Sequence, residues 1–186
     1  MKPVSTRKTM ATKFRDRYRI ESTRLKNYDY SQNGAYFITI CTNKRVNFLG
    51  EIIDSKLSET KQSKICIECW NDLSNHYPNC ILDEFIVMPN HVHGIVIIDN
   101  FKINIQPNDN QKNHSVSEII RAFKPFSSRR INEYQNTYGL SIWQSRFHDH
   151  IIRDEESLNK IRQYIINNPF NWATDELFAE LPTTLP

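Results

Sequence analysis

Apolar and polar residues alternate along this chain with two different periods, which predict its strands and helices. A period of two, or a short apolar run, marks four expected strands at 35–42, 80–88, 91–98 and 147–153. Pro89 lies between the middle two, which are therefore two strands or one long strand broken there. Residues 47–53 could pair with the first strand through a short polar turn at 42–45.

A helical period marks three further segments. The segment 57–77 carries a one-sided stripe of Ile65, Cys69, Trp70 and Leu73. A second helix opens at the capping box Ser115 to Glu118, carries Ile119, Ile120 and Phe123, and should be kinked or broken by Pro125. A third runs over 155–168, with Asp154 as its cap and Leu158, Ile161 and Ile165 as its buried stripe. This order predicts an α+β fold, a mostly antiparallel sheet with helices packed on it.

Length and composition favour one domain. The 186 residues, 39% of them hydrophobic, suffice for one core, and we expect a basic arm at 1–27, a folded domain at 28–175 and a tail at 176–186. No apolar run approaches 18 residues and no leader is evident, so neither a membrane span nor a secretory signal is expected. The four cysteines lie in apolar surroundings, which predicts reduced thiols in a cytosolic protein.

Charge is concentrated at the start of the chain. The net charge is +3, but residues 1–26 carry about +7, so the remainder is close to −4. A basic arm suits a polyanionic partner, and a solubilising tail is the alternative. With four glycines, the chain has no G-x-G-x-x-G or P-loop motif, which argues against a nucleotide-hydrolysing motor.

Two pairs of polar residues are candidates for chemistry. His91 and His93, separated by Val92 within an apolar strand, should project from one face about 7 Å apart, a spacing that suits one metal ion or two structural histidines. Tyr164 and Asn168 are an i, i+4 pair on the flank of the last helix, where they could serve packing and capping or catalysis.

These motifs resemble a known family, the HUH single-tyrosine transposases, and most closely its REP-associated subgroup. The similarity runs through YDYSQNGAYFITICT, LDEFIVMPNHVHGIV, FKPFSSRRIN, IWQSRFHDHIIRD and IRQYIINNPFNW, between residues 28 and 172. It implies an HUH endonuclease fold, a ferredoxin- or RRM-like sandwich. It also implies that His91 and His93 bind the metal, Tyr164 is the nucleophile and Asn168 is the third ligand. Asn167 is the alternative, because Asn168 precedes Pro169.

The resemblance further implies the reaction. Mg²⁺ or Mn²⁺ would suit a site of two imidazoles and an amide oxygen, while the lack of a third histidine or a carboxylate in the motif disfavours zinc. The tyrosine would attack single-stranded DNA beside a hairpin, leaving a 5′-phosphotyrosine and a free 3′-hydroxyl. The protein is expected in the bacterial cytoplasm, associated with DNA. Either a monomer or a homodimer is compatible with the resemblance.

Other residues are candidates for a supporting role. DNA contacts are expected from Arg121, Lys124, Arg129, Arg130, Trp143 and Arg146, with Gln144 beside them. The alternatives are a solvated helix face for the cations and a core position for the tryptophan. In the second His-x-His, at 148–150, we expect His150 to lie near the site, with a structural role as the alternative.

Two functions compete with a DNA strand-transfer enzyme. In the first, the protein binds hairpin nucleic acid through its basic arm and basic helix without catalysis. In the second, it is a metal-dependent hydrolase that does not act on DNA, whose activity would survive replacement of Tyr164 but not of His91.

Overall fold

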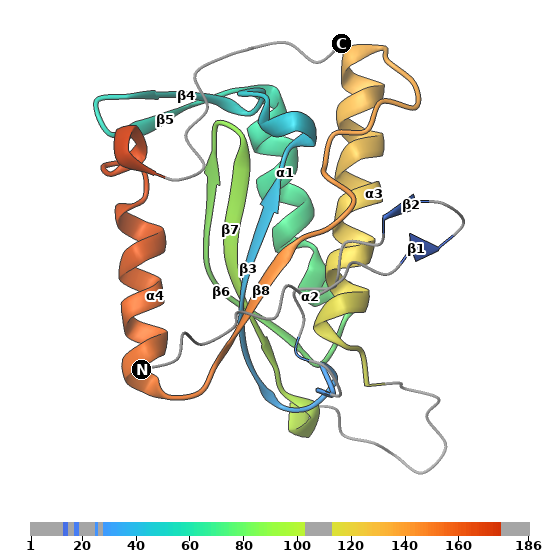
Figure 1. Ribbon diagram of the computed structural model, residues 1–186, viewed down its shortest axis with the longest axis vertical. Helices are drawn as coiled ribbons and strands as arrows, with labels where there is room; N and C mark the ends of the chain where they lie inside the picture. Colours follow the sequence, from blue (N-terminus) through green and yellow to red (C-terminus); the bar gives the residue numbers. More distant parts are fainter. Residues whose placement is uncertain (1–12, 15–16, 19–24, 26–27, 103–112, 176–186) are drawn as a thin grey trace, which may run out of the picture.

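An antiparallel sheet of four strands organises the protein (Figure 1). The computed structural model describes residues 13–14, 17–18, 25, 28–102 and 113–175. Strand order across the sheet is β6, β7, β3, β8. The strands are β6 Cys80–Met88, β7 His91–Ile98, β3 Gly34–Cys41 and β8 His148–Ile152. The expected fold class is confirmed, and Pro89 and Asn90 form the turn between two separate strands rather than an interruption in one.

Helices cover both faces of this sheet. The helices are α1 Lys61–Asn71, α2 Leu73–His76, α3 Val116–Gln135 and α4 Glu155–Asn167. The larger core joins α1 and α3 to one face of the sheet and contains Trp70, Phe123 and Ile38. The smaller core lies on the other face, where Leu158 and Ile165 of α4 pack against the sheet. In Figure 1, α4 and α3 stand on opposite sides of the strands.

The helix starts follow the predicted caps. Ser115 and Glu118 form the expected capping box of α3, and Asp154 accepts a hydrogen bond from the backbone of Ser157 at the start of α4. Pro125, however, does not break α3, which continues to Gln135. Because Pro125 is exposed, the carbonyl one turn earlier that loses its helical partner can bond to water instead.

Two local expectations were wrong. Residues 47–53 do not pair with β3; instead β4 Gly50–Ile53 pairs with β5 Lys56–Glu59 in a separate hairpin. Both edges of β3 are already occupied, by β7 and β8. The first helix starts at Lys61 rather than near residue 57, because Thr60 and Ser63 cap it there.

The centre of β7 is in close contact with α1. An added Cβ at Gly94 would overlap Cζ2 of Trp70, so only glycine allows this approach. Trp70 in turn stacks on Phe85 of β6, with ring centroids 4.4 Å apart. One face of β7 is therefore fixed against the larger core, and its other face is left for the histidines.

Short elements complete the described chain. They are β1 Lys13–Phe14, β2 Arg17–Tyr18, and the 3₁₀ turns η1 Asn43–Arg45, η2 Asn100–Lys102 and η3 Trp172–Thr174. Most of the expected basic arm, part of the loop after residue 99 and the expected tail lie outside the described residues. All four cysteines are buried and free, as expected. None of the described helices combines the length and apolar character needed to cross a bilayer.

Candidate metal and tyrosine site

His91 and His93 lie at the start of β7, on the face that α4 covers. Their ring centroids are 4.4 Å apart, and the two side chains are almost completely buried. Val92, between them, faces the larger core. The alternation of the strand thus places both imidazoles on one side, as the sequence predicts.

Each histidine is oriented by a hydrogen bond at Nδ1. Nδ1 of His91 lies 2.8 Å from Oδ1 of Asn90, and Nδ1 of His93 lies 2.9 Å from Oγ1 of Thr39. The amide nitrogen of Asn90 donates to the carbonyl of Arg45, so its oxygen faces His91 and can only accept. His91 therefore carries its proton on Nδ1, and Nε2 presents a lone pair. This arrangement is usual for histidines that bind metals.

Burial keeps both imidazoles neutral. It lowers the pKa of His91 and of His93 to about 3, from an ordinary value of 6.5. The charge of Arg45 lowers the pKa of His91 further, and the neighbouring His91 lowers the pKa of His93. Neutral rings at pH 7 are the form that binds a metal ion.

Tyr164 reaches this pair from α4. Its hydroxyl lies 3.4 Å from Nε2 of His93, and the residue is 45% exposed. Phe37 of β3 contacts both side chains, with centroids 5.1 Å from His93 and 5.9 Å from Tyr164. The phenol and the histidines therefore come together within one chain, at a residue that stays partly exposed.

Asn168, rather than Asn167, faces the histidines. Asn168 is buried and keeps right-handed helical backbone angles despite the following proline, whereas Asn167 is exposed. Nδ2 of Asn168 donates to the carboxylate of Asp175 at 3.0 Å. Its Oδ1 has no hydrogen-bond partner in the described structure, and neither has Nε2 of His91.

Asp175 was missed by the sequence reasoning. Its carboxylate and the ring nitrogens of His91 and His93 all lie within 4.8 Å of one another. No periodic pattern marks this residue, because it follows the short turn η3 and lies outside any helix or strand. The only available signal was a carboxylate shortly after the resembling segment. Since a carboxylate is present after all, its absence from the motif no longer argues against zinc.

These residues fit a divalent cation. An unpaired buried nitrogen and an unpaired buried amide oxygen each cost roughly 1–3 kcal/mol, and a cation would satisfy both. The donors would be two imidazole nitrogens, the Asn168 oxygen and the Asp175 carboxylate. Such a mixed set suits Mn²⁺, Mg²⁺ or Zn²⁺.

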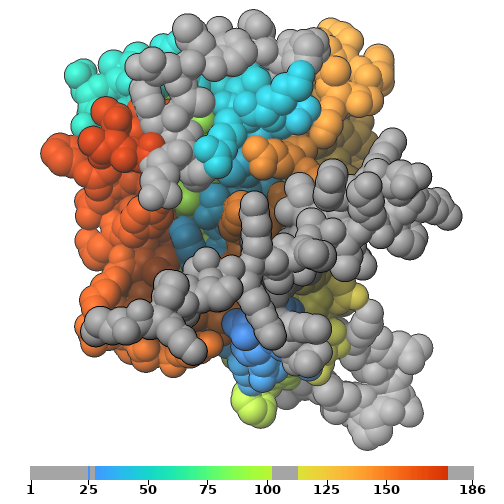
Figure 2. Space-filling view, in the orientation of Figure 1, coloured from blue at the N-terminus to red at the C-terminus, as the bar shows by residue number. Residues whose placement is uncertain are grey.

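A cleft of about 560 Å³ opens over the site. The residues that line it are Phe37, Thr39, Arg45, His93, His148, Tyr164, Asn168, Asn171, Thr174 and Asp175. In Figure 2, parts of the strands are visible between α4 and the loop that follows β3. His148, rather than the expected His150, lines the cleft, because His148 pairs with Thr39 beside the site and His150 lies two residues farther along β8.

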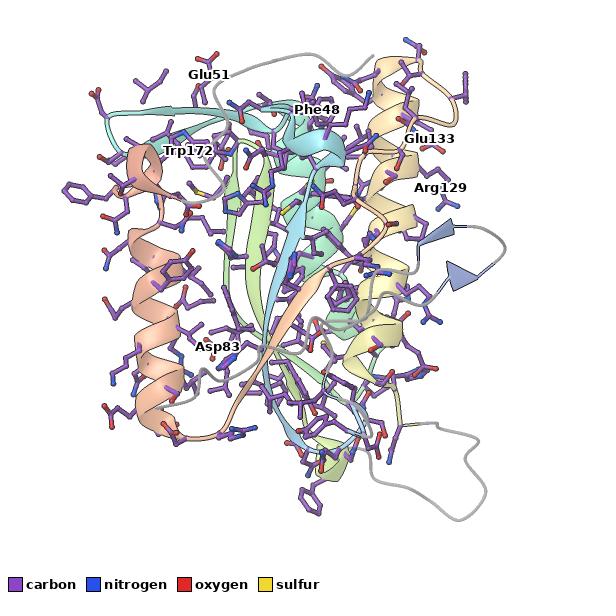
Figure 3. The ribbon with its side chains drawn as sticks, viewed as in Figure 1. Phe48, Glu51, Asp83, Arg129, Glu133 and Trp172 are labelled. Atoms are coloured by element: carbon purple, nitrogen blue, oxygen red, sulfur yellow. The ribbon has the colours of Figure 1, made fainter. Side chains whose placement is uncertain are left out.

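The expected DNA-contacting residues are placed elsewhere. Those on α3 lie across the sheet from the cleft, and Figure 3 shows Arg129 and Glu133 on the side of α3 that faces away from α4. Arg130 pairs with Glu68, and the ammonium group of Lys124 donates to the Ser145 carbonyl.

Trp143 belongs to the core. It is 3% exposed, and its indole donates to Ser127 Oγ at 2.9 Å. Trp143 therefore occupies a core position, which was the alternative to a DNA contact. Gln144 is half-buried, whereas Arg121 and Arg146 are exposed. None of these four residues lines the cleft.

Comparison with known proteins defines the class to which this fold and site belong. Residues 30–168 match the family model described as "Transposase IS200 like". A protein of uncharacterised function from Haemophilus influenzae is 34% identical over 169 residues, which cover 86% of this chain and 93% of that protein. A second protein from that organism, named as a candidate REP-associated tyrosine transposase, is 28% identical over 166 residues, or 85% and 84% of the two chains.

A solved structure has the same fold. It is a REP-associated tyrosine transposase bound to a REP hairpin, 20% identical, with a TM-score of 0.55 over 81% of this chain and 74% of that one. The match to the family model covers most of the chain. The protein belongs to the IS200-like transposase family, and the resemblance to the single-tyrosine transposases is confirmed.

Proposed function

We propose that this protein is a metal-dependent transposase that cuts and joins single-stranded DNA beside a hairpin, through a covalent phosphotyrosine. The observation that carries the proposal is the distance of 3.4 Å between the Tyr164 hydroxyl and Nε2 of His93. Tyr164 and the neutral imidazole of His93 both line an open cleft, and the ring of His91 contacts that of His93. Membership of a transposase family makes DNA the expected substrate.

The proposed step exchanges one phosphate ester for another. The Tyr164 oxygen bonds to phosphorus, the bond from phosphorus to the 3′ oxygen breaks, and that oxygen leaves as a hydroxyl after taking up a proton. The phenol proton is lost to solvent, to which Tyr164, as a partly exposed residue, has access. Because no ester is hydrolysed, a 3′-hydroxyl from another strand can reverse the step and join two ends.

His91, His93, Asn168 and Asp175 are the residues that we assign to holding the ion. When bound, a divalent cation would favour the phenolate over the phenol and neutralise charge on the phosphate. An ordinary tyrosine has a pKa near 10, so only about 0.1% is ionised at pH 7. Thr39 and Asn90 would keep the two imidazoles in the required orientation.

A single-stranded substrate with a hairpin suits this geometry. Tyr164 stands on a helix that is packed against the sheet, so it cannot swing far to reach a phosphate in stacked duplex. The similar solved structure is of a transposase bound to a REP hairpin, and we assign the same kind of partner to this chain. A second copy is not required for the site, because one chain supplies the phenol and both imidazoles.

A covalent capture assay tests the proposal. The protein is incubated with Mn²⁺ and labelled oligonucleotides that carry candidate hairpins from the DNA flanking its gene, and adducts are separated under denaturing conditions. We expect an adduct with the wild type and none with Tyr164→Phe, which retains the fold and binds the hairpin. Tyr134→Phe is the matched control, since Tyr134 is an exposed tyrosine of α3.

Two outcomes would contradict the proposal. Hairpin binding without any adduct would indicate the non-catalytic nucleic-acid-binding alternative. An activity on a substrate other than DNA that survives Tyr164→Phe but not His91→Ala would indicate the hydrolase alternative.

A further inference from the structure

Arg45 places a positive charge in the cleft from an element that carries none of the residues assigned so far. It is the last residue of η1, and it lines the same cleft as Tyr164 and His93. In the described part of the chain, the arginines that form ion pairs are Arg129, Arg130 and Arg162, and Arg45 is not among them.

The loop that carries Arg45 is tied to the turn before the histidines. The backbone and side chain of Thr42 both donate to the carbonyl of Asn90, and the backbone nitrogens of Phe48 and Leu49 donate to the carbonyl of Pro89. The carbonyl of Arg45 accepts from the Asn90 amide that orients His91. These hydrogen bonds therefore fix the position of the Arg45 backbone relative to the imidazoles of the metal site.

The backbone at Arg45 is also in an unfavourable conformation. Lys44 and Arg45 have φ angles of 55° and 56°, in the left-handed region that side chains other than glycine disfavour. A strained backbone conformation persists only where contacts with the surrounding structure maintain it, and such conformations cluster at functional sites. Here the strained Arg45 is one of the residues that line the cleft.

We infer that Arg45 is a catalytic residue that binds the non-bridging oxygens of the phosphate attacked by Tyr164. This inference rests on the proposed function. A guanidinium presents paired N–H donors that match two phosphate oxygens, and it stays protonated throughout, so it supplies charge and orientation but moves no proton. The phosphate would lie between Arg45 and the phenol, and the cleft has room for a phosphodiester.

The test measures the rate of adduct formation with saturating hairpin oligonucleotide for Arg45→Ala, Arg45→Lys and Arg45→Gly. We expect the alanine and glycine variants to lose roughly 10²- to 10³-fold in rate, as when a transition-state donor is removed. Added guanidinium ion, far below denaturing concentrations, should restore part of that rate. Lys44→Ala is the matched control, because Lys44 shares the loop and the strained backbone but does not line the cleft.

Arg45→Gly separates catalysis from folding. Glycine relieves the left-handed strain, so this variant should melt no lower than the wild type while its rate falls. Rates of Arg45→Ala and Arg45→Gly within threefold of the wild type would overturn the inference. A loss that guanidinium does not restore and that matches a loss of Mn²⁺ affinity would also overturn it, because Arg45 would then act through Asn90 and His91. No adduct with the wild type would instead refute the proposed function, and this inference with it.

Discussion

The hydroxyl of Tyr164 lies 3.4 Å from Nε2 of His93, although 71 positions separate the two residues in the chain. The smaller core holds them in this relation, since Ile165 is buried directly after Tyr164 and Ile95 is buried two residues after His93. The distance is therefore a property of how α4 packs on the sheet.

Substitutions of the proposed metal ligands should weaken Mn²⁺ binding to different extents. His91→Ala should abolish Mn²⁺ binding, and Asp175→Asn should weaken it about tenfold by removing a negative charge. Isothermal titration calorimetry of the wild type, both variants and the exposed control Glu156→Gln would measure this. Equal affinity in Asp175→Asn and the wild type would remove Asp175 from the donor set.

The hydrogen bond between Thr39 and His93 predicts a further effect on Mn²⁺ affinity. Thr39→Val keeps the shape of the side chain but removes the oxygen 2.9 Å from Nδ1. Mn²⁺ affinity should fall roughly 10- to 100-fold, as for other residues that orient a ligand. Thr174→Val, in the same cleft but bonded to a backbone carbonyl, should bind Mn²⁺ normally. The opposite order of affinities would contradict this assignment.

Substitution of two glycines, Gly94 and Gly34, by alanine tests how much the close packing at Gly94 contributes to stability. Gly94→Ala should lower the free energy of unfolding by about 1–3 kcal/mol, because its Cβ would overlap the Trp70 ring. Gly34→Ala should change it little, since the nearest atom to its Cβ would be 3.6 Å away. Urea unfolding measures both, and similar losses in the two variants would show that the close approach at Gly94 is unimportant.

The lowered histidine pKa values predict an acid-sensitive fold in the absence of metal. Below pH 6.5 the unfolded chain binds protons at these positions, whereas in the folded protein their pKa is about 3. Stability is therefore complete above pH 6.5 and falls between 6.5 and 3, by up to about 1.4 kcal/mol per pH unit for each histidine. Urea unfolding of the metal-free protein at pH 7 and pH 5 tests this. A smaller difference is expected in the His91→Gln, His93→Gln double variant.

An ion pair fixes α4 on the sheet near Tyr164. Arg162 donates to both carboxylate oxygens of Asp83 on β6, at 2.9 and 2.6 Å, and Figure 3 shows Asp83 beside α4. Arg162→Met should slow adduct formation about tenfold while Mn²⁺ affinity stays constant, because the phenol is displaced but the histidines are not. Lys160→Met, which breaks an exposed pair with Glu156, is the control and should have no effect.

Local patterns predicted the elements that carry the site. The alternation in β7 placed both histidines on one face, and the helical period of α4 placed Tyr164 and Asn168 together. Relations between distant segments were not readable in this way. The pairing of β3 depends on which strands occupy its edges, and the choice of His148 over His150 depends on a cross-strand register. Asp175 lies beyond α4, and its place beside the histidines depends on tertiary contacts such as its hydrogen bond with Asn168.

The four-residue spacing between Tyr164 and Asn168 has a consequence for how this protein can vary. Each residue turns a helix by about 100°, and Pro169 follows at once, so the end of α4 has no room to absorb an extra residue. Inserting or deleting one amino acid within this last turn would rotate the phenol or the amide away from the sheet. Length changes that a surface loop tolerates would here separate the attacking oxygen from the imidazoles.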